Sequence, residues 1–242
     1  CEILNPTNCD EALVTVTVES APILAVDDTG GPVNGYEGGT AVSNVLDNDL
    51  LNGLPVIPSE VLITAVLDPV DGVTLNTATG EVTVDPQTPG GTYYITYQIC
   101  EILNPTNCDE ALVTVTVESA PILAEDDTYS GINGYEGNPN VGNALLENDL
   151  LNGAPVLLDE ITANVDTPAT PVNPGDPVPV LDPLTGIVSV PAGTPAGIYT
   201  IEYTICELLN PLNCDEATIT VTVESAPILA VDDTGGPVNG YE

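Results

Sequence analysis

A block of 25 residues occurs three times in this chain. Residues 1–25 are repeated letter for letter at 100–124, and again with four changes at 206–230. Copies that begin at 1, 100 and 206 are about one small domain apart, which predicts a tandem array of a single domain type. We therefore expect the last hairpin of a preceding repeat (1–20), two whole repeats (21–120 and 121–226) and the start of a further repeat (227–242).

The charge of the chain is extreme and has one sign. The chain has no Lys, Arg or His and 37 Asp and Glu, so its formal net charge is −37, although 43% of its residues are hydrophobic. This apolar content argues against disorder, and the lack of cations argues against nucleic acid as a partner. No apolar run is long enough for membrane insertion. Because no His or Lys can act as a base and the acidic residues recur with the repeat, we do not expect an enzyme.

Short segments of alternating hydrophobicity run along each repeat, and none has helical periodicity. In the first repeat we expect strands at Pro22–Asp28, Thr40–Leu46, Val61–Leu67, Gly72–Asn76, Glu81–Val84, Thr92–Cys100 and Cys108–Glu118. This number of strands in about a hundred residues is typical of an immunoglobulin-like sandwich. The predicted fold class is all-β, with Greek-key β-sandwich domains arranged end to end. The second repeat is expected to have a longer loop at Thr167–Pro183.

The cysteines form three pairs with the same seven-residue spacer: Cys1/Cys9, Cys100/Cys108 and Cys206/Cys214. An even count at fixed spacing favours disulfides in an oxidising compartment, whereas a metal site would need His or further Cys nearby. Period-two alternation places Tyr93, Ile95, Tyr97 and Ile99 on the inner face of one strand. It places both cysteines of a pair on the outer, Thr-rich face. We predict a disulfide that closes each loop, with a stabilisation of about 2.5 kcal/mol.

Acidic residues lie close to the joint between repeats, which has the sequence Glu-Ser-Ala-Pro-Ile-Leu-Ala at 19–25, 118–124 and 224–230. The joint has no Gly and one Pro, so we expect it to be short and stiff. Two interpretations of the acidic residues stay open. They form a solvated surface that keeps the array soluble, or they supply the six to eight oxygen ligands that Ca²⁺ needs. The candidate calcium ligands are Asp27, Asp28, Asp47, Asp49, Asp126, Asp127 and Asp149.

A module that binds glycans or surfaces needs exposed aromatic side chains. Tyr36, Tyr135 and Tyr241 recur in the sequence Asn-Gly-Tyr-Glu and are the candidates for such contacts. The alternative is that each tyrosine packs against a loop or the neighbouring domain. Lateral pairing of chains through the Thr-rich faces is a third possibility, which the net charge of −37 opposes at low salt.

Two sequence signatures resemble known surface proteins. A-V-D-D-T at 25–29, followed by N-V-L-D-N-D-L-L-N-G at 44–53, resembles the cadherin-like and immunoglobulin-like tandem repeats of giant bacterial surface proteins. Y-x-I-x-Y-x-I-C at 93–100, followed by N-P-T-N-C-D-E-A-x-V-T-V-T-V at 104–117, resembles repeats of SprB-type gliding adhesins of Bacteroidota. The resemblance covers the whole chain.

The resemblance implies a long filament on the cell surface, anchored at the outer membrane, exported by the type IX secretion system and moved by the gliding motor. Other parts of such a protein would bind the substratum or a surface polysaccharide. Many cadherin-like relatives bind calcium through an acidic stretch after Asn-Asp, where this chain has Leu50-Leu51-Asn52-Gly53. We predict a stiff, disulfide-stapled stalk segment of an extracellular adhesin. The alternative is a repeated glycan- or surface-binding module.

Overall fold

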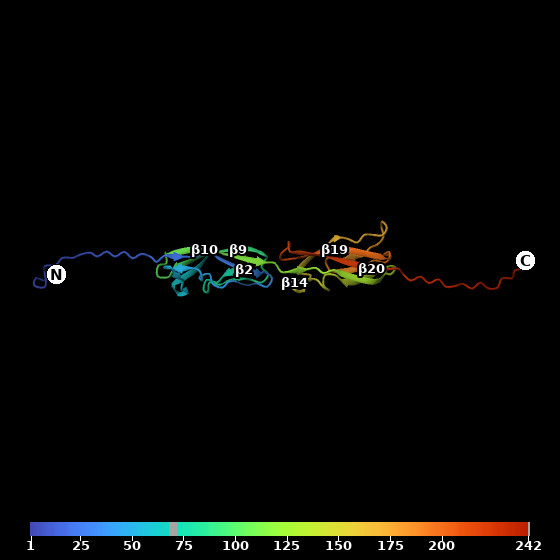
Figure 1. Ribbon diagram of the computed structural model, residues 1–242, viewed down its shortest axis with the longest axis horizontal. Coiled ribbons are helices and arrows are strands. Elements are labelled where there is room, and N and C mark those ends of the chain that lie inside the picture. The colour runs from blue at the N-terminus through green and yellow to red at the C-terminus, as the bar shows by residue number, and fades with distance from the viewer. Residues whose placement is uncertain (68–71, 242) are drawn as a thin grey trace. The chain divides into compact units, whose positions relative to one another are not determined.

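The computed structural model describes residues 1–67 and 72–241, and the chain it shows is all-β (Figure 1). The only helical element in these residues is a short 3-10 turn, η1, at Pro58–Glu60. The strands enclose two separate hydrophobic cores, one in each predicted repeat. The predicted β-sandwich fold class is therefore confirmed. No helix in the described part of the chain is long and apolar enough to span a membrane.

The first repeat contains a main sheet, an opposing sheet and a small accessory sheet. The main sheet has the order β2 (Asp28–Asn34), β10 (Cys108–Glu118), β9 (Gly91–Glu101) and β6 (Val61–Leu67). The opposing sheet has the order β3 (Gly39–Val42), β8 (Val82–Val84) and β7 (Val73–Leu75). The accessory sheet has the order β1 (Ile23–Leu24), β4 (Leu50–Leu51) and β5 (Leu54–Pro55).

The second repeat has the same three sheets in the same order. Its main sheet is β12 (Asp127–Asn133), β20 (Cys214–Glu224), β19 (Gly197–Glu207) and β16 (Ile161–Thr167). Its opposing sheet is β13 (Asn138–Asn143), β18 (Ile187–Val190) and β17 (Val180–Leu181). Its accessory sheet is β11 (Ile122–Leu123), β14 (Leu150–Leu151) and β15 (Ala154–Pro155). Strand β12 runs parallel to β20, whereas β19 and β20 are antiparallel.

The alternation of the last hairpin builds each core. Ile95, Tyr97 and Ile99 of β9 are fully buried. Val113 and Val115 of the neighbouring strand β10 are also fully buried and belong to the same core. Tyr93 is partly buried and packs against the same core. Full burial of one such aliphatic side chain contributes about 1.5–3 kcal/mol, so this hairpin supplies much of the hydrophobic stabilisation. The inner face that alternation predicted is confirmed.

The first predicted strand, Pro22–Asp28, is wrong as a single element. Residues 23–24 pair in the accessory sheet, and the chain joins the main sheet only at Asp28. The cause lies between them, where the N–H groups of Ala25 and Val26 donate to aspartate side chains instead of to a neighbouring strand. A backbone N–H that donates to a side chain cannot also pair with a neighbouring strand, so the strand is interrupted at these residues.

The second predicted strand, Thr40–Leu46, is too long. Strand β3 ends at Val42, because the Oδ1 atom of Asn44 accepts the N–H of Leu46 at 3.1 Å and closes a turn. Such side-chain turns are a common local competitor of strands. Of the other expected strands, Val61–Leu67 and Cys108–Glu118 are confirmed with identical ends. The remaining three differ by one residue, at one end for β8 and at both ends for β7 and β9.

The sequence analysis did not predict the hairpin β4–β5. It turns at Asn52 and Gly53, whose φ angles of 54° and 74° lie in the left-handed region. Two consecutive left-handed residues form the two-residue turn that fits the twist of antiparallel strands, and Asn-Gly is its preferred sequence. The longer loop of the second repeat lies at residues 168–179 between β16 and β17, and the predicted bounds Thr167–Pro183 are too wide because β17 lies within them. Residues 68–71, in the matching connection of the first repeat, and residue 242 lie outside the described residues.

Candidate functional site

The segment that leads into each repeat is bound to that repeat by hydrogen bonds that recur in both copies. In addition to five such contacts, Asn48 and Tyr97 in the first repeat and Asn148 and Tyr203 in the second add further bonds to its carbonyls. We call residues 21–27 and 120–126 the joining segments. In the first repeat, the carbonyl of Ala21 accepts the side-chain amide of Asn107 at 2.7 Å. The carbonyl of Pro22 accepts the backbone N–H of Asn52 at 2.7 Å. These two contacts fasten the start of the joining segment to two different loops of one domain.

Three aspartates fasten the rest of the first joining segment. Asp109 Oδ2 accepts the N–H of Ala25 at 2.9 Å, and Asp49 Oδ1 accepts the N–H of Val26 at 2.8 Å. Asp27 belongs to the joining segment itself, and its Oδ1 accepts the N–H of Leu112 in β10 at 2.8 Å. Hydrogen bonds to ionised groups are stronger than neutral ones, at about 1.5–3 kcal/mol each.

The second joining segment has the same five contacts. Its carbonyl contacts are Ala120 with Asn213 at 2.6 Å and Pro121 with Asn152 at 2.7 Å. Its aspartate contacts are Ala124 with Asp215 at 2.9 Å, Glu125 with Asp149 at 2.9 Å, and Asp126 with Thr218 at 2.8 Å. Because all five contacts are present in both repeats, this binding of the joining segment is a general feature of the repeat sequence.

A cluster of two aspartates and a tyrosine lies in the interior of each repeat, next to the joining segment. In the first repeat, the hydroxyl of Tyr97 lies 3.0 Å from Asp49 Oδ1, and Asp49 is fully buried. Asp28 approaches the same hydroxyl, and burial raises its pKa to about 6. Burial also raises the pKa of Asp49 and of Tyr97. No cation is present anywhere in the sequence to offset these carboxylates.

The second repeat has the same cluster, with Tyr203 between Asp149 at 3.1 Å and Asp127 at 3.4 Å. Burial is the main cause that raises the pKa of Asp149 to about 6, and burial followed by the charge of Asp149 raises the pKa of Asp127 to about 7. A carboxyl group in an apolar interior favours its neutral form, so these groups hold protons at a pH where surface aspartates do not.

Of the candidate calcium ligands, Asp28 and Asp49 come together at Tyr97, and Asp127 and Asp149 come together at Tyr203, whereas the other three lie elsewhere. Asp27 and Asp28 are neighbours whose carboxylates turn to different partners, the N–H of Leu112 and the hydroxyl of Tyr97. Asp47 is exposed, and Asp126 accepts a backbone N–H. Within residues 1–67 and 72–241, no three His, Cys, Asp or Glu side chains are grouped so as to hold a metal ion. The calcium sites stay a prediction.

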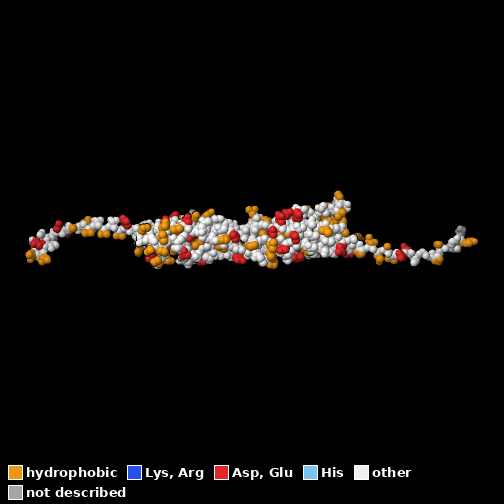
Figure 2. Space-filling model, in the orientation of Figure 1, with side chains coloured by type: hydrophobic (Ala, Val, Ile, Leu, Met, Phe, Trp, Pro, Cys, Tyr) orange, Lys and Arg blue, Asp and Glu red, His pale blue; other side chains and the backbone are white. Residues whose placement is uncertain are grey.

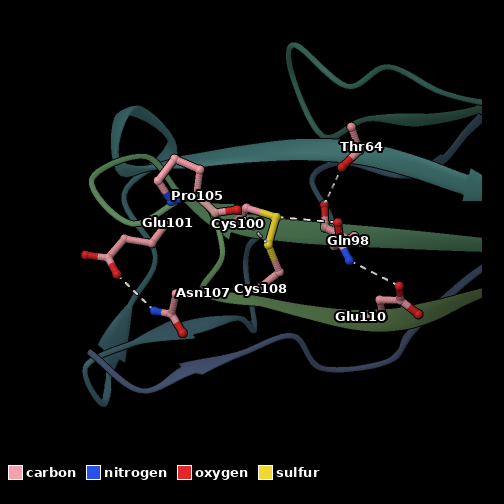
Figure 3. The surroundings of a disulfide bond; sticks show 8 residues. All are labelled: Thr64, Gln98, Cys100, Glu101, Pro105, Asn107, Cys108 and Glu110. Carbon is pink, nitrogen blue, oxygen red and sulfur yellow. Dashed lines mark hydrogen bonds between the residues drawn. A yellow bond between two sulfur atoms is a disulfide. The ribbon is translucent and has the colours of Figure 1, made fainter. Parts of the chain in front are cut away.

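The Cys100–Cys108 and Cys206–Cys214 loops lie at the end of the main sheets, where Asn107 and Asn213 contact the joining segments, and Figure 3 shows the first of them. The predicted disulfides are confirmed in all three copies: Cys1–Cys9, Cys100–Cys108 and Cys206–Cys214. In the second repeat, Cys206 and Cys214 are directly opposite each other in the β19–β20 ladder. The cross-strand position that alternation requires is therefore the one observed.

The three candidate contact tyrosines share one local turn. The backbone N–H of Tyr36, Tyr135 and Tyr241 donates to the Oδ1 atom of the asparagine two residues earlier, at 2.9, 3.0 and 3.3 Å. Tyr135 and Tyr241 are 78% and 91% exposed, and Tyr36 is partly buried. The turn presents the tyrosine at the end of β2 and of β12. Their role in binding stays a prediction.

Acidic side chains are spread over the visible surface of both repeats, and no basic side chain is present (Figure 2). Because like charges repel over about 10 Å at moderate salt, this coat opposes association of the surfaces that carry it.

Sequence reasoning missed the asparagines and two of the aspartates that bind the joining segments. Asn107 and Asp109 flank Cys108 in the sequence Asn-Cys-Asp, and their counterparts flank Cys214. The signal was available, because polar residues with short side chains beside a strand start are frequent acceptors and donors for backbone groups. Their partner, 86 residues away for Asn107, was not visible in the sequence.

No family model and no curated protein matches this sequence. Among solved structures, the chain is similar to cadherin domains 3–6 of protocadherin gamma B2, with 10% identity and a TM-score of 0.35 over 86% of this chain and 52% of that chain. It is also similar to human CDH23 domains EC21–23, with 14% identity and a TM-score of 0.33 over 85% of this chain and 70% of that chain. A third similar structure is BT4661, a SusE-like surface polysaccharide-binding protein of Bacteroides thetaiotaomicron, with 14% identity and a TM-score of 0.30 over 84% of this chain and 34% of that chain. The chain thus spans about half the length of the protocadherin fragment, and similarity at this level carries no conclusion about function.

Proposed function

We propose that this chain is a spacer segment of a long extracellular filament, which holds an adhesive part of the same protein away from the cell. The observation that carries the proposal is the binding of both joining segments by the same five contacts. Strand β10 ends at Glu118 and the next fastened residue is Ala120, so one residue, Ser119, separates two repeats. A connection of one residue between fastened segments has little conformational freedom, which suits a stiff stalk.

The extracellular location is supported by the covalent chemistry. All six cysteines are paired, and disulfides of this kind persist in oxidising compartments. We propose further that the filament belongs to a bacterial surface adhesin of the SprB type, anchored at the outer membrane, exported by type IX secretion and used in gliding. This finer proposal is supported by the Y-x-I-x-Y-x-I-C and Asn-Pro-Thr-Asn-Cys-Asp-Glu signatures. It assigns no catalytic role to the repeats.

The spacer proposal is tested by exchange of the repeats within the full-length protein. The two repeats at residues 21–226 are replaced by two unrelated rigid β-sandwich domains of similar size, and the cells that stay attached to glass under flow are counted. A matched variant deletes the same residues without replacement. A spacer requires that the replacement restores attachment while the deletion reduces it. If the replacement attaches no better than the deletion, the sequence of these repeats has a function of its own and the spacer proposal is wrong.

A repeated binding module is the second candidate, because some aromatic side chains remain exposed. Tyr135 is 78% exposed and Tyr94 is 58% exposed. Exposed tyrosines are frequent contact residues in binding surfaces. A glycan array probed with the 242-residue chain separates the two functions. A signal that is lost in Tyr135→Ala and kept in a control such as Leu184→Ala, whose side chain is also exposed, would establish the module.

Calcium at the joints remains a proposal that rests on the density of carboxylates there. Binding would use the carboxylate oxygens that the N–H contacts leave over, such as Oδ2 of Asp27, whose Oδ1 accepts the N–H of Leu112. Calorimetric melting in calcium and in a chelator tests it. A rise in Tm with calcium that disappears in Asp27→Asn supports ion sites at the joints. Equal melting under both conditions assigns these aspartates to their N–H contacts alone.

A further inference from the structure

The disulfide loop has the same internal hydrogen bonds in all three copies. In residues 1–9, the N–H of Glu2 donates to the carbonyl of Asn8 at 3.0 Å, and the N–H of Asn8 donates to the carbonyl of Asn5 at 2.9 Å. The corresponding bonds are 3.0 and 2.8 Å in both other copies. Residues 1–9 are exposed throughout, whereas the other two loops adjoin a packed domain. The loop therefore takes its form without help from a hydrophobic core.

The loop also sets the direction of one asparagine side chain. The Nδ2 atom of Asn107 donates one N–H to Glu101 Oε2 at 2.9 Å, within the loop, as Figure 3 shows. Asn213 and Glu207 form the same bond at 2.8 Å, and Asn8 and Glu2 form it at 3.0 Å without any joining segment nearby. Because an amide nitrogen carries two N–H groups, one bond to the glutamate leaves the second N–H in a fixed direction.

That second N–H meets the joining segment. Asn107 donates it to the carbonyl of Ala21 at 2.7 Å, and Asn213 donates it to the carbonyl of Ala120 at 2.6 Å. Glu101 and Glu207 are 8% and 1% exposed, so the asparagine is held on one side by a largely buried residue. Preorganised donors lose little side-chain entropy when they bind, which makes such a contact stronger than a free surface contact.

We propose that Asn107 and Asn213 are positioning residues, each held by its disulfide loop, and that they fasten the joining segment to the repeat that follows it. The purpose of this fastening rests on the proposed spacer function, but the contact itself does not. Ala21 precedes Asn107 by 86 residues, so the joining segment is synthesised long before the loop that fastens it. A joint therefore becomes fixed only when the last hairpin of the following repeat has closed its disulfide.

The donor role is separated from a space-filling role by Asn213→Asp. Aspartate has the same shape, but its carboxylate has no N–H and would face two acceptors, the Ala120 carbonyl and Glu207. A space-filling residue tolerates this change, whereas a donor does not. Leu212→Ala is the matched control, because Leu212 is the preceding residue of the loop and is 99% exposed. In the first repeat, the corresponding pair is Asn107→Asp with Thr106→Ala as control.

The measurement is amide hydrogen exchange by mass spectrometry on the 242-residue chain, with peptides that cover residues 19–27 and 118–126. We expect Asn213→Asp to speed exchange at 118–126 about fivefold, since the net loss of one hydrogen bond is about 1 kcal/mol. Exchange at 19–27 should not change. Asn107→Asp should have the reverse pattern, so each joining segment is the internal control for the other.

The double variant Cys206→Ser/Cys214→Ser keeps Asn213 and tests the dependence on the loop. The proposal requires faster exchange at 118–126 while β19 and β20 remain protected. Unchanged exchange at 118–126 in Asn213→Asp or in the cysteine variant overturns the proposal. A uniform rise over all peptides of the repeat also overturns it, because the loop would then serve the core. None of these results alters the attachment test, so the spacer function and the asparagine contact fail independently.

Discussion

The second repeat should lose stability as the pH rises from 5 to 8, because two buried carboxyl groups share one hydroxyl donor in its interior with no cation beside them. Asp149 is fully buried and Asp127 is almost so. Both approach the hydroxyl of Tyr203, which carries a single proton and cannot donate to both carboxylates at once. One further proton on the pair supplies the missing donor, and a rise in pH removes it.

The sign and size of the effect follow from the pKa values. Burial raises the pKa of Asp149 from 3.8, its ordinary value, to about 6, and that of Asp127 to about 7. Below pH 3.8 the folded and unfolded states both hold the proton, and between 4 and 6 only the folded state does. The stabilisation is therefore full below pH 4, declines progressively as the pH rises above 4, and is gone above pH 6 to 7. Between pH 5 and the folded pKa values lie about one to two pH units, so the loss measured between pH 5 and pH 8 is about 1.4 to 2.7 kcal/mol.

Urea denaturation at pH 5 and pH 8, at constant ionic strength and with a chelator, measures this loss by tyrosine fluorescence. Asp149→Asn keeps the shape of the side chain, cannot ionise and removes the charge that raises the pKa of Asp127, so it should reduce the difference between the two pH values. Glu216→Gln removes one charge from the exposed face of β20 and controls for general repulsion among the acidic residues. Equal pH dependence of the wild type and Asp149→Asn would refute the assignment of the effect to the buried pair.

Three other changes have defined outcomes. Cys100→Ser/Cys108→Ser should lower the free energy of unfolding of the first repeat by about 2.5 kcal/mol, measured by urea denaturation against the oxidised wild type; an unchanged midpoint would contradict the entropic role of the loop. Tyr97→Phe should cost about 1–3 kcal/mol in the same assay, because buried Asp49 loses its hydroxyl donor, whereas exposed Tyr94→Phe should cost nothing measurable. Gly142→Ser should destabilise the second repeat by about 1–3 kcal/mol, because a Cβ atom there would clash with the ring of Tyr129. Adding Tyr129→Gly, which reproduces the Gly30 and Ser43 pair of the first repeat, should restore part of that stability; no restoration would contradict the clash.

Sequence patterns predicted the elements whose signal is local and repeated. The alternation in Thr92–Cys100 and Cys108–Glu118 was sufficient to predict two strands, their inner face and the disulfide, because each follows from a period of two. The hairpin at Asn52-Gly53 carried a strong turn signal, but its strands have only two residues each, too short for alternation to appear. The break after Leu24 was unpredictable for another reason, since its cause is the distant Asp109.

The acidic residues illustrate the same limit at the candidate site. Composition and position made Asp27, Asp28 and Asp49 equal candidates for calcium. In the fold, Asp27 binds a strand N–H, whereas Asp28 and Asp49 approach a buried tyrosine. Whether a carboxylate contacts an N–H, a hydroxyl or an ion depends on groups that lie 48 and 85 residues away in the sequence, and no local pattern encodes them. The same distance concealed the partner of Asn107.

The placement of the five contacts explains why the 25-residue block is copied so faithfully. Ala21 and Ala25 come from the end of one block, whereas Asn107 and Asp109 come from the start of the next, so the end of each block must fit the start of its successor. With identical blocks, the end of any block fits the start of any other, so repeats can be gained or lost without a mismatched joint.

The third block tests this reasoning through its four changes, which are Leu208, Leu212, Thr218 and Ile219. Leu208 and Leu212 are exposed, Ile219 is an aliphatic core residue in place of Val113, and Thr218 contributes only its backbone N–H to the joining segment. Every side chain that fastens the segment is unchanged, as expected if the repeats are retained for their joints.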